Sequence, residues 1–295
     1  MDRVRTRIRT RDGGQGQNRV RGAARTRAVA VSGVVVALVV GATACGASAR
    51  DDQEPEQRSF GLHGRTLTVD SDDSALDLVV SDSSKAGEIQ VTRWFSGHVT
   101  LGGDPKVTWA MRDGNRLVLR VKCSGVVADC SARHRIVVPR GVAVKVGSGD
   151  GGVSARGFEE ALSVRTGDGS IRVGDSSGPL ALRSGDGSIR VGDSSGPLDL
   201  RSGDGSIQAV GVNSTSVRTH SGDGSVRLEL ASVPDLVDSV SGDGSVSMVL
   251  PRATYKVATG SGDGSVHVDV PRDDTSSHRV SAHTGDGKIT VRTAN

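Results

Sequence analysis

From residue 142 onward, apolar and polar residues alternate with a period of two on both sides of a recurring Gly-Asp-Gly tripeptide. In every unit the third residue after the aspartate is Val or Ile, and the sixth residue before it is Val or Leu. Such alternation predicts a β-strand with one buried face, and a glycine-rich tripeptide between two strands predicts a turn. We therefore expect two short strands in each unit.

The tripeptide occurs eight times at a nearly constant spacing. Its central residues are Asp150, Asp168, Asp186, Asp204, Asp223, Asp243, Asp263 and Asp286, with successive spacings of 18, 18, 18, 19, 20, 20 and 23 residues. Residues 171–188 and 189–206 are identical except that Ala181 in the first becomes Asp199 in the second. A sustained period of this length is typical of repeat proteins in which each unit packs only on its neighbours.

Two arrangements fit these units. Asp-Gly between alternating apolar residues is a local signal for an antiparallel hairpin. The near-constant period and the exchangeable 18-residue units favour a parallel stack, in which each residue lies beside its counterpart in the next unit. The sequence therefore predicts an all-β protein, a parallel β-solenoid (β-helix-like) of 18–23 residue coils, over residues 142–295.

Residues 60–141 repeat less clearly, and we expect them to form an irregular β cap at the N-terminal end of the solenoid. Strands are predicted at 66–69, 75–80, 88–95, 107–112, 117–122 and 135–138. Asp113-Gly114-Asn115 is a candidate hairpin turn. This section holds Phe60, Trp94, Phe95 and Trp109, which suit a section that covers an open end of the stack.

The N-terminus has the layout of a signal peptide, predicted here over residues 1–44. Nine arginines and two aspartates in residues 1–27 precede an uncharged apolar run, Ala28–Ala44. The run ends in Gly41-Ala42-Thr43-Ala44-Cys45, which resembles the bacterial lipobox except that Ala42 replaces the usual Leu. The resemblance implies that Cys45 is lipidated. An uncleaved membrane anchor is the alternative, although seventeen residues are few for a span.

Either form of the leader predicts an extracytoplasmic protein anchored to the outer face of the cell membrane. Without the leader's nine arginines and two aspartates, the chain's 37 basic and 34 acidic residues fall to 28 and 32, a net charge of −4. The high pI of about 9.0 therefore belongs to the leader, and we expect no nucleic-acid partner. Residues 45–59 contain almost no apolar side chain and are predicted to be a flexible tether.

Cys123 and Cys130 are the two cysteines that follow Cys45. They are seven residues apart between predicted strands, in an exported chain, and we expect them to form a disulfide. A metal site is the alternative. It would need two further ligands, and His134 is the one candidate nearby.

The chain resembles a bacterial putative-adhesin family of β-strand-repeat domains of unknown function. The resemblance is carried by SGDGSI-like segments such as Ser184–Ile189 and by the VPRGV-like segment Val138–Val142, and it extends over residues 67–292. It implies a β-solenoid at the cell envelope, often in a lipoprotein. It implies no reaction and no catalytic residue.

Stacking would bring the eight aspartates into one row. Calcium could relieve their repulsion, or each Asp could accept backbone N–H groups in its own turn while Gly supplies a positive φ. Basic residues at the third position before Asp could also neutralise the row, namely Arg165, Arg183, Arg201 and His220. Around Asp243 and Asp263 such residues are missing, so these two are the calcium candidates. No other cofactor is expected.

Parallel β-helices also include enzymes that cleave polysaccharides. A catalytic site requires unlike groups at one break in the repeat, whereas these units are uniform and the chain is 2% aromatic. His63, His98, His134, His220, His267, His278 and His283 are scattered and are expected at the surface. We therefore predict no enzyme, but a lipid-anchored, adhesin-like envelope scaffold or interaction module whose partner is an envelope protein or glycan. A glycan-binding or glycan-cleaving β-helix protein is the alternative.

Overall fold

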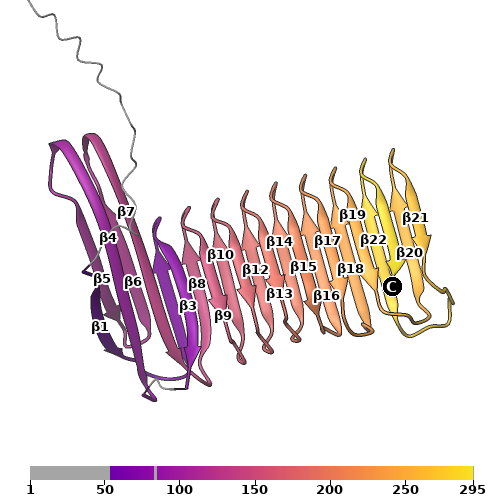
Figure 1. The fold of residues 1–295 in the computed structure, drawn as a ribbon, viewed down its shortest axis with the longest axis horizontal. Coiled ribbons are helices and arrows are strands. Elements are labelled where there is room, and N and C mark those ends of the chain that lie inside the picture. The colour runs from indigo at the N-terminus through magenta and orange to yellow at the C-terminus, as the bar shows by residue number, and fades with distance from the viewer. Residues whose placement is uncertain (1–53, 83–84, 295) are drawn as a thin grey trace, which may run out of the picture. The chain divides into compact units, whose positions relative to one another are not determined.

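In a computed structural model, residues 54–82 and 85–294 form two sheets of short strands (Figure 1). The predicted signal peptide, Cys45 and most of the predicted tether lie outside the described residues. No helix within the described ranges is long and apolar enough to cross a membrane. The predicted all-β solenoid is confirmed, because most neighbouring strands in both sheets run parallel.

The two sheets are named A and B. Sheet A has the spatial order β1 (Glu56–Gly61), β4 (Glu88–Gly102), β7 (Gly125–Pro139), β3 (Ala75–Ser81), β9 (Val153–Arg156), β11 (Ile171–Gly174), β13 (Ile189–Gly192), β15 (Ile207–Val212), β17 (Val226–Leu230), β19 (Val246–Leu250), β23 (Ile289–Thr293) and β21 (Val266–Asp269). Sheet B has the order β20 (Lys256–Ser261), β22 (Arg279–Thr284), β18 (Leu236–Ser241), β16 (Ser216–Ser221), β14 (Leu198–Ser202), β12 (Leu180–Ser184), β10 (Leu162–Thr166), β8 (Ala143–Ser148), β2 (Thr66–Ser71), β6 (Arg116–Lys122) and β5 (Lys106–Arg112).

Each coil consists of a strand in sheet B, a Gly-Asp-Gly turn and a strand in sheet A. Equivalent residues of successive coils pair in register, so Leu162 lies beside Leu180 and Ile171 beside Ile189. The inward residues are buried, while the alternate residues face solvent. The parallel stack is therefore correct, and the chain of hairpins is wrong for these units.

The N-terminal section combines coils of the stack with antiparallel strands. The pairs β2/β3 and β6/β7 continue the two sheets in parallel, with β6/β7 outside β2/β3. The sheets end in the antiparallel strands β1, β4 and β5 (Figure 1). Each strand predicted within residues 60–141 overlaps an observed strand, and Asp113-Gly114-Asn115 forms the β5–β6 hairpin turn.

The predicted tether ends earlier than the sequence suggests. Strand β1 begins at Glu56, and its residues pair with β4 from Glu56–Arg93 to Gly61–Glu88. Its side chains are mostly exposed, so apolar burial gives little signal there. Backbone pairing with β4 orders this segment, which an argument from side-chain composition alone misses.

The C-terminal coils are not stacked in chain order. Strands β22 and β23 lie between β18/β19 and β20/β21, and all these neighbours are parallel. We call β22/β23 the inserted coil and β20/β21 the end coil. Asp286 therefore lies between the calcium candidates Asp243 and Asp263 in the stack, because Gly285 N–H binds the Gly242 carbonyl and Gly262 N–H binds the Gly285 carbonyl. The two candidates are not neighbours.

The glycines of the turns permit close stacking rather than a positive φ. None of the Gly-Asp-Gly glycines has a positive φ. A Cβ added to Gly187 would lie 2.3 Å from the Gly169 carbonyl oxygen of the preceding turn. A Cβ added to Gly205 would likewise lie 2.2 Å from the Gly187 carbonyl oxygen. These distances leave no room for a side chain. The prediction that glycine is needed for its φ is therefore wrong at these turns.

Hydroxyl groups bind the stacked turns together. Ser202 Oγ donates to the Gly187 carbonyl oxygen at 3.0 Å, and Ser184 Oγ donates to that of Gly169 at 2.9 Å. These serines are buried, and a threonine does the same at Thr166 within its own turn. Backbone bonds of the turn aspartates also join the turns, because Asp204 N–H donates to the Gly185 carbonyl oxygen at 3.3 Å and Asp223 N–H to that of Gly203 at 3.2 Å.

Candidate binding surface

The outer face of sheet B carries a row of basic side chains near the turns. Arg165, Arg183, Arg201 and His220 pair with one another in register on β10, β12, β14 and β16. We call these four residues the arginine row. Because neighbouring strands are about 4.8 Å apart, the row repeats a basic side chain at that spacing. Gly147 on β8 and Val240 on β18 occupy the same position and end the row.

The arginine row does not neutralise the turn aspartates as the sequence suggested. Within the described residues, no ion pair of 4.0 Å or less joins the row to the aspartates of the turns. Asp199 pairs instead with Arg201 at 3.0 Å and with Arg183 at 3.7 Å. Asp199 is the single position at which the two duplicated units differ. Among the described residues, the four basic groups of the row thus have one acidic partner, Asp199.

A shallow hollow of about 450 Å³ lies along the arginine row. Its wall consists of the four basic residues, of hydroxyl residues at the strand ends and of turn glycines, namely Thr166, Ser184, Ser202, Gly185, Gly203 and Gly222. A guanidinium donates two parallel hydrogen bonds to a carboxylate or phosphate, so a row of them suits a partner with repeated anionic groups.

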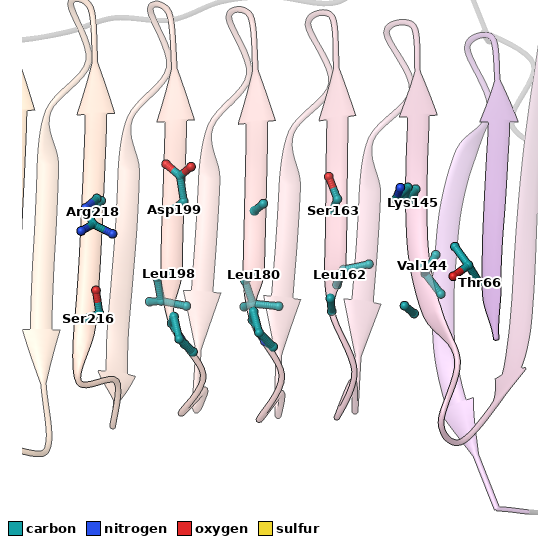
Figure 2. Close-up of a pocket in the computed structure, with 15 residues that line it drawn as sticks. Thr66, Val144, Lys145, Leu162, Ser163, Leu180, Leu198, Asp199, Ser216 and Arg218 are labelled. Carbon is teal, nitrogen blue, oxygen red and sulfur yellow. The ribbon is translucent and has the colours of Figure 1, made fainter.

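An apolar groove of about 290 Å³ lies at the opposite ends of the same strands. Figure 2 shows Leu162, Leu180 and Leu198 side by side along it. Exposed Pro179 and Pro197 flank these leucines. The groove and the arginine row therefore lie on the same strands from β10 to β16.

A polar line separates the groove from the row. It contains Lys145, Ser163, Ala181, Asp199 and Arg218 on the successive strands β8, β10, β12, β14 and β16, and Figure 2 labels all of them except Ala181. The charges alternate along this line, unlike those of the arginine row. The face therefore presents basic side chains near the turns and the exposed rings of Pro179 and Pro197 at the opposite strand ends.

The remaining predicted residues lie elsewhere. Cys123 and Cys130 form a disulfide with a Cα–Cα distance of 6.1 Å, next to the β4–β7 pair. No group of three or more His, Cys, Asp or Glu side chains in the part of the chain that the structure describes could hold a metal ion. Asp243 and Asp263 thus belong to no such group, and Cys45 lies outside the described residues.

His134 is the exception among the histidines, because it is fully buried rather than at the surface. Its ring lies 6.3 Å from that of Trp109, and neither ring nitrogen has a hydrogen-bond partner. Burial, with the nearby charge of Arg93, lowers the pKa of His134 to about 4. The residue therefore stays neutral in the folded protein at ordinary pH.

Two long sheets of short, mostly parallel strands define this protein as a β-solenoid of stacked coils. The chain belongs to the Toastrack DUF4097 family, whose model matches residues 47–295. That family match agrees with the resemblance seen in the SGDGSI-like and VPRGV-like segments.

Several solved structures are similar to this chain. A putative adhesin from Bacteroides fragilis is 13% identical with a TM-score of 0.49, and the match covers 81% of this chain and 97% of that one. A putative adhesin from Parabacteroides merdae is also 13% identical with a TM-score of 0.49, and the match covers 83% of this chain and 98% of that one. A putative cell adhesion protein from Clostridium sporogenes is 10% identical with a TM-score of 0.26, and the match covers 82% of this chain and 100% of that one. No curated protein matches the chain.

Proposed function

We propose that this chain is a non-enzymatic binding scaffold, held on the outer face of the cell membrane by a lipid on Cys45. Its binding face is the outer face of sheet B, and its partner carries repeated anionic groups. The observation that carries this proposal is the arginine row, in which four basic side chains stand in register over a shallow hollow.

The uniform coils support a binding role rather than catalysis. A catalytic site needs unlike groups that converge on one reacting atom. Strands β10, β12 and β14 instead repeat the same arginine at the same position, which suits a partner that is itself repetitive. An acidic glycan of the envelope has this character, and so does an acidic stretch of an envelope protein.

The sequence around Cys45 supports the anchor. A small-residue segment precedes this cysteine, and β1 begins at Glu56, so only a short segment separates the proposed lipid from the first strand. A Cys45→Ala variant should lose lipid labelling and move from the membrane fraction into the medium. Retention of the variant in the membrane would favour the uncleaved anchor instead.

Binding to arrayed acidic and neutral glycans tests the binding face. The triple variant Arg165→Ser, Arg183→Ser and Arg201→Ser should lose binding to the acidic glycans. A matched triple variant on the outer face of sheet A should keep it, namely Arg172→Ser, Arg190→Ser and Arg227→Ser, which removes three exposed arginines as well. Equal losses in both variants would mean that net charge, not this face, determines binding.

The outcome of the array also distinguishes the two partner classes. Glycan binding that depends on the arginine row favours a polysaccharide partner. If no glycan binds, the same variants are compared for salt-sensitive capture of envelope proteins, because contacts between exposed charges weaken as salt rises. If neither glycan binding nor protein capture depends on the arginine row, the outer face of sheet B is not the binding face.

A further inference from the structure

The end coil leaves two strand edges open at the C-terminal end of the stack. Strand β20 is the last strand of sheet B and β21 is the last strand of sheet A (Figure 1). Each pairs on one side only, with β22 and β23 respectively. An open edge presents unpaired backbone N–H and C=O groups to any strand that can align with it.

The apolar interior is also uncovered at this end. Val266 is 44% exposed, whereas its counterparts in the other seven coils, Val153, Ile171, Ile189, Ile207, Val226, Val246 and Ile289, are at most 2% exposed. Val257 and Val268 are likewise only partly buried, although the matching positions of the other coils are buried. The end coil therefore packs against an apolar neighbour on one side only, the side of the inserted coil.

The N-terminal end differs. There the antiparallel strands β1 and β5 form the last strands of the two sheets, and Trp109 of β5 is 5% exposed. Phe60 of β1 packs on Trp109 with ring centroids 6.1 Å apart. Aromatic side chains thus cover the interior at this end, and no equivalent cover exists among the described residues at the C-terminal end.

The inserted coil helps to fix the position of the two open strand edges. Because β22/β23 lies inside the stack, the end coil is joined to the chain on both sides rather than being a frayed terminus. Tyr255 closes this coil: its N–H binds the Pro271 carbonyl at 2.9 Å, and its hydroxyl donates to the Pro251 carbonyl at 2.7 Å. The edges are thereby held at a fixed separation.

We infer that the end coil pairs with the end coil of a second copy of this chain. A partner must present two strand edges about 10 Å apart, the separation of two packed sheets, with apolar side chains between them. The end coil itself presents both. A two-fold axis makes the contact self-complementary, with antiparallel pairing across it.

The charges at the margin fit this arrangement. Lys256 begins β20 and Asp269 ends β21, so both lie on the side of the coil away from the Gly-Asp-Gly turn. A two-fold axis along the strands places β20 of one copy beside β21 of the other, and it brings these opposite charges to the same margin. Because the two-fold contact uses both open edges, it closes at a dimer and does not continue into a fibre.

Light scattering on the size-fractionated full chain in mild detergent tests this inference. The wild-type chain should have the mass of a dimer, and Val266→Lys should have the mass of a monomer. Val126→Lys is the matched control, because Val126, on β7 near the opposite end, is the other large apolar residue exposed among the side chains that the structure describes, at 79%. It should stay dimeric.

A wild-type monomer at every concentration, or an unchanged dimer in Val266→Lys, would overturn the inference. Circular dichroism melting of both lysine variants checks that they fold, and a second variant, His267→Glu, tests the same edge without adding a cation beside the core. Glycan binding by the arginine row is measured on the same samples. Its persistence in a monomeric Val266→Lys variant would separate self-association from the proposed binding function.

Discussion

Thr284 Oγ1 donates a hydrogen bond of 2.8 Å to the carbonyl oxygen of Gly244, 40 residues earlier in the chain. Equivalent bonds elsewhere join successive turns, such as Ser202 to Gly187, 15 residues apart. The bond from Thr284 places the last Gly-Asp-Gly turn on the sixth rather than on the seventh. The C-terminal segment is thus an interior part of the stack.

Removal of residues 276–295 should therefore destabilise the fold more than removal of an internal coil. The truncation takes out the inserted coil, exposes the apolar edge of β18/β19 and leaves the end coil without its neighbour. Deletion of residues 171–188 instead lets Ile189 pair with Val153, as Ile171 does now. Thermal melting should show a cooperative transition near the wild-type temperature for the internal deletion and a much lower one for the truncation.

Equal melting temperatures for these two variants would contradict the inverted order of the C-terminal coils. In a stack that followed chain order, the truncation would only shorten the protein by its last coil. Loss of the cooperative transition in the internal deletion would count against equivalent, stacked coils.

Gly187→Ala should destabilise the protein by about 1–3 kcal/mol or more, because the new methyl group overlaps the Gly169 carbonyl. Gly174→Ala, at the end of β11 in the preceding coil, is the matched control. Its added Cβ has its nearest neighbour at 4.0 Å and its φ is not positive, so the change should stay within about 1 kcal/mol. Denaturant unfolding measures both. Similar losses would mean that the turns do not stack as closely as described.

His134 should make stability depend on pH between about 6.5 and 4. Above pH 6.5 the ring is neutral in both the folded and the unfolded chain, so it contributes no pH dependence. Below that pH, the His134 ring binds a proton in the unfolded chain but not in the folded chain. The free energy of unfolding therefore falls by up to roughly 3 kcal/mol and levels off below the folded pKa of about 4.

A His134→Leu variant isolates this contribution. Since neither ring nitrogen has a hydrogen-bond partner, the leucine loses no polar contact. The difference in unfolding free energy between variant and wild type should grow in favour of the variant as pH falls from 6.5 to 4. A constant difference over that range would show that His134 is not held neutral.

The coils themselves could be predicted, because period-two alternation at Ile171 and Ile189 directly reports which residues face inward. The same alternation could have identified His134, which stands at inward parity between buried Ala132 and Ile136. At this position the period-two alternation, rather than the usual preference of histidine for the surface, correctly indicates a buried side chain.

The order of the C-terminal coils could not be predicted in the same way. Equivalent coils present nearly the same surfaces, so no local pattern states which two will be neighbours. The one available signal is the spacing of 23 residues between Asp263 and Asp286, the longest in the series, which leaves chain for the crossover. The role of Gly187 was missed for a related reason, since its constraint comes from the Gly169 carbonyl of another coil.

The arginine row was predicted as a set of residues but not in its contacts. Period and register place Arg183 and Arg201 beside each other, whereas the choice of ionic partner depends on side-chain geometry. Asp199 lies on the same outer face as these arginines and pairs with both. The turn aspartates lie beyond the strand ends.

The most direct test of the account compares unfolding of Ile189→Asp with that of Arg190→Asp. Ile189 is fully buried between Ile171 and Ile207, so an aspartate there becomes an unpaired buried carboxylate and should cost several kcal/mol. Arg190 is exposed on the opposite face and has no ion pair among the described residues, so its replacement should change stability by less than about 1 kcal/mol. A large drop in melting temperature for Ile189→Asp alone is the predicted result. Comparable drops for both variants would contradict the assignment of inner and outer faces, and with it the stacked solenoid.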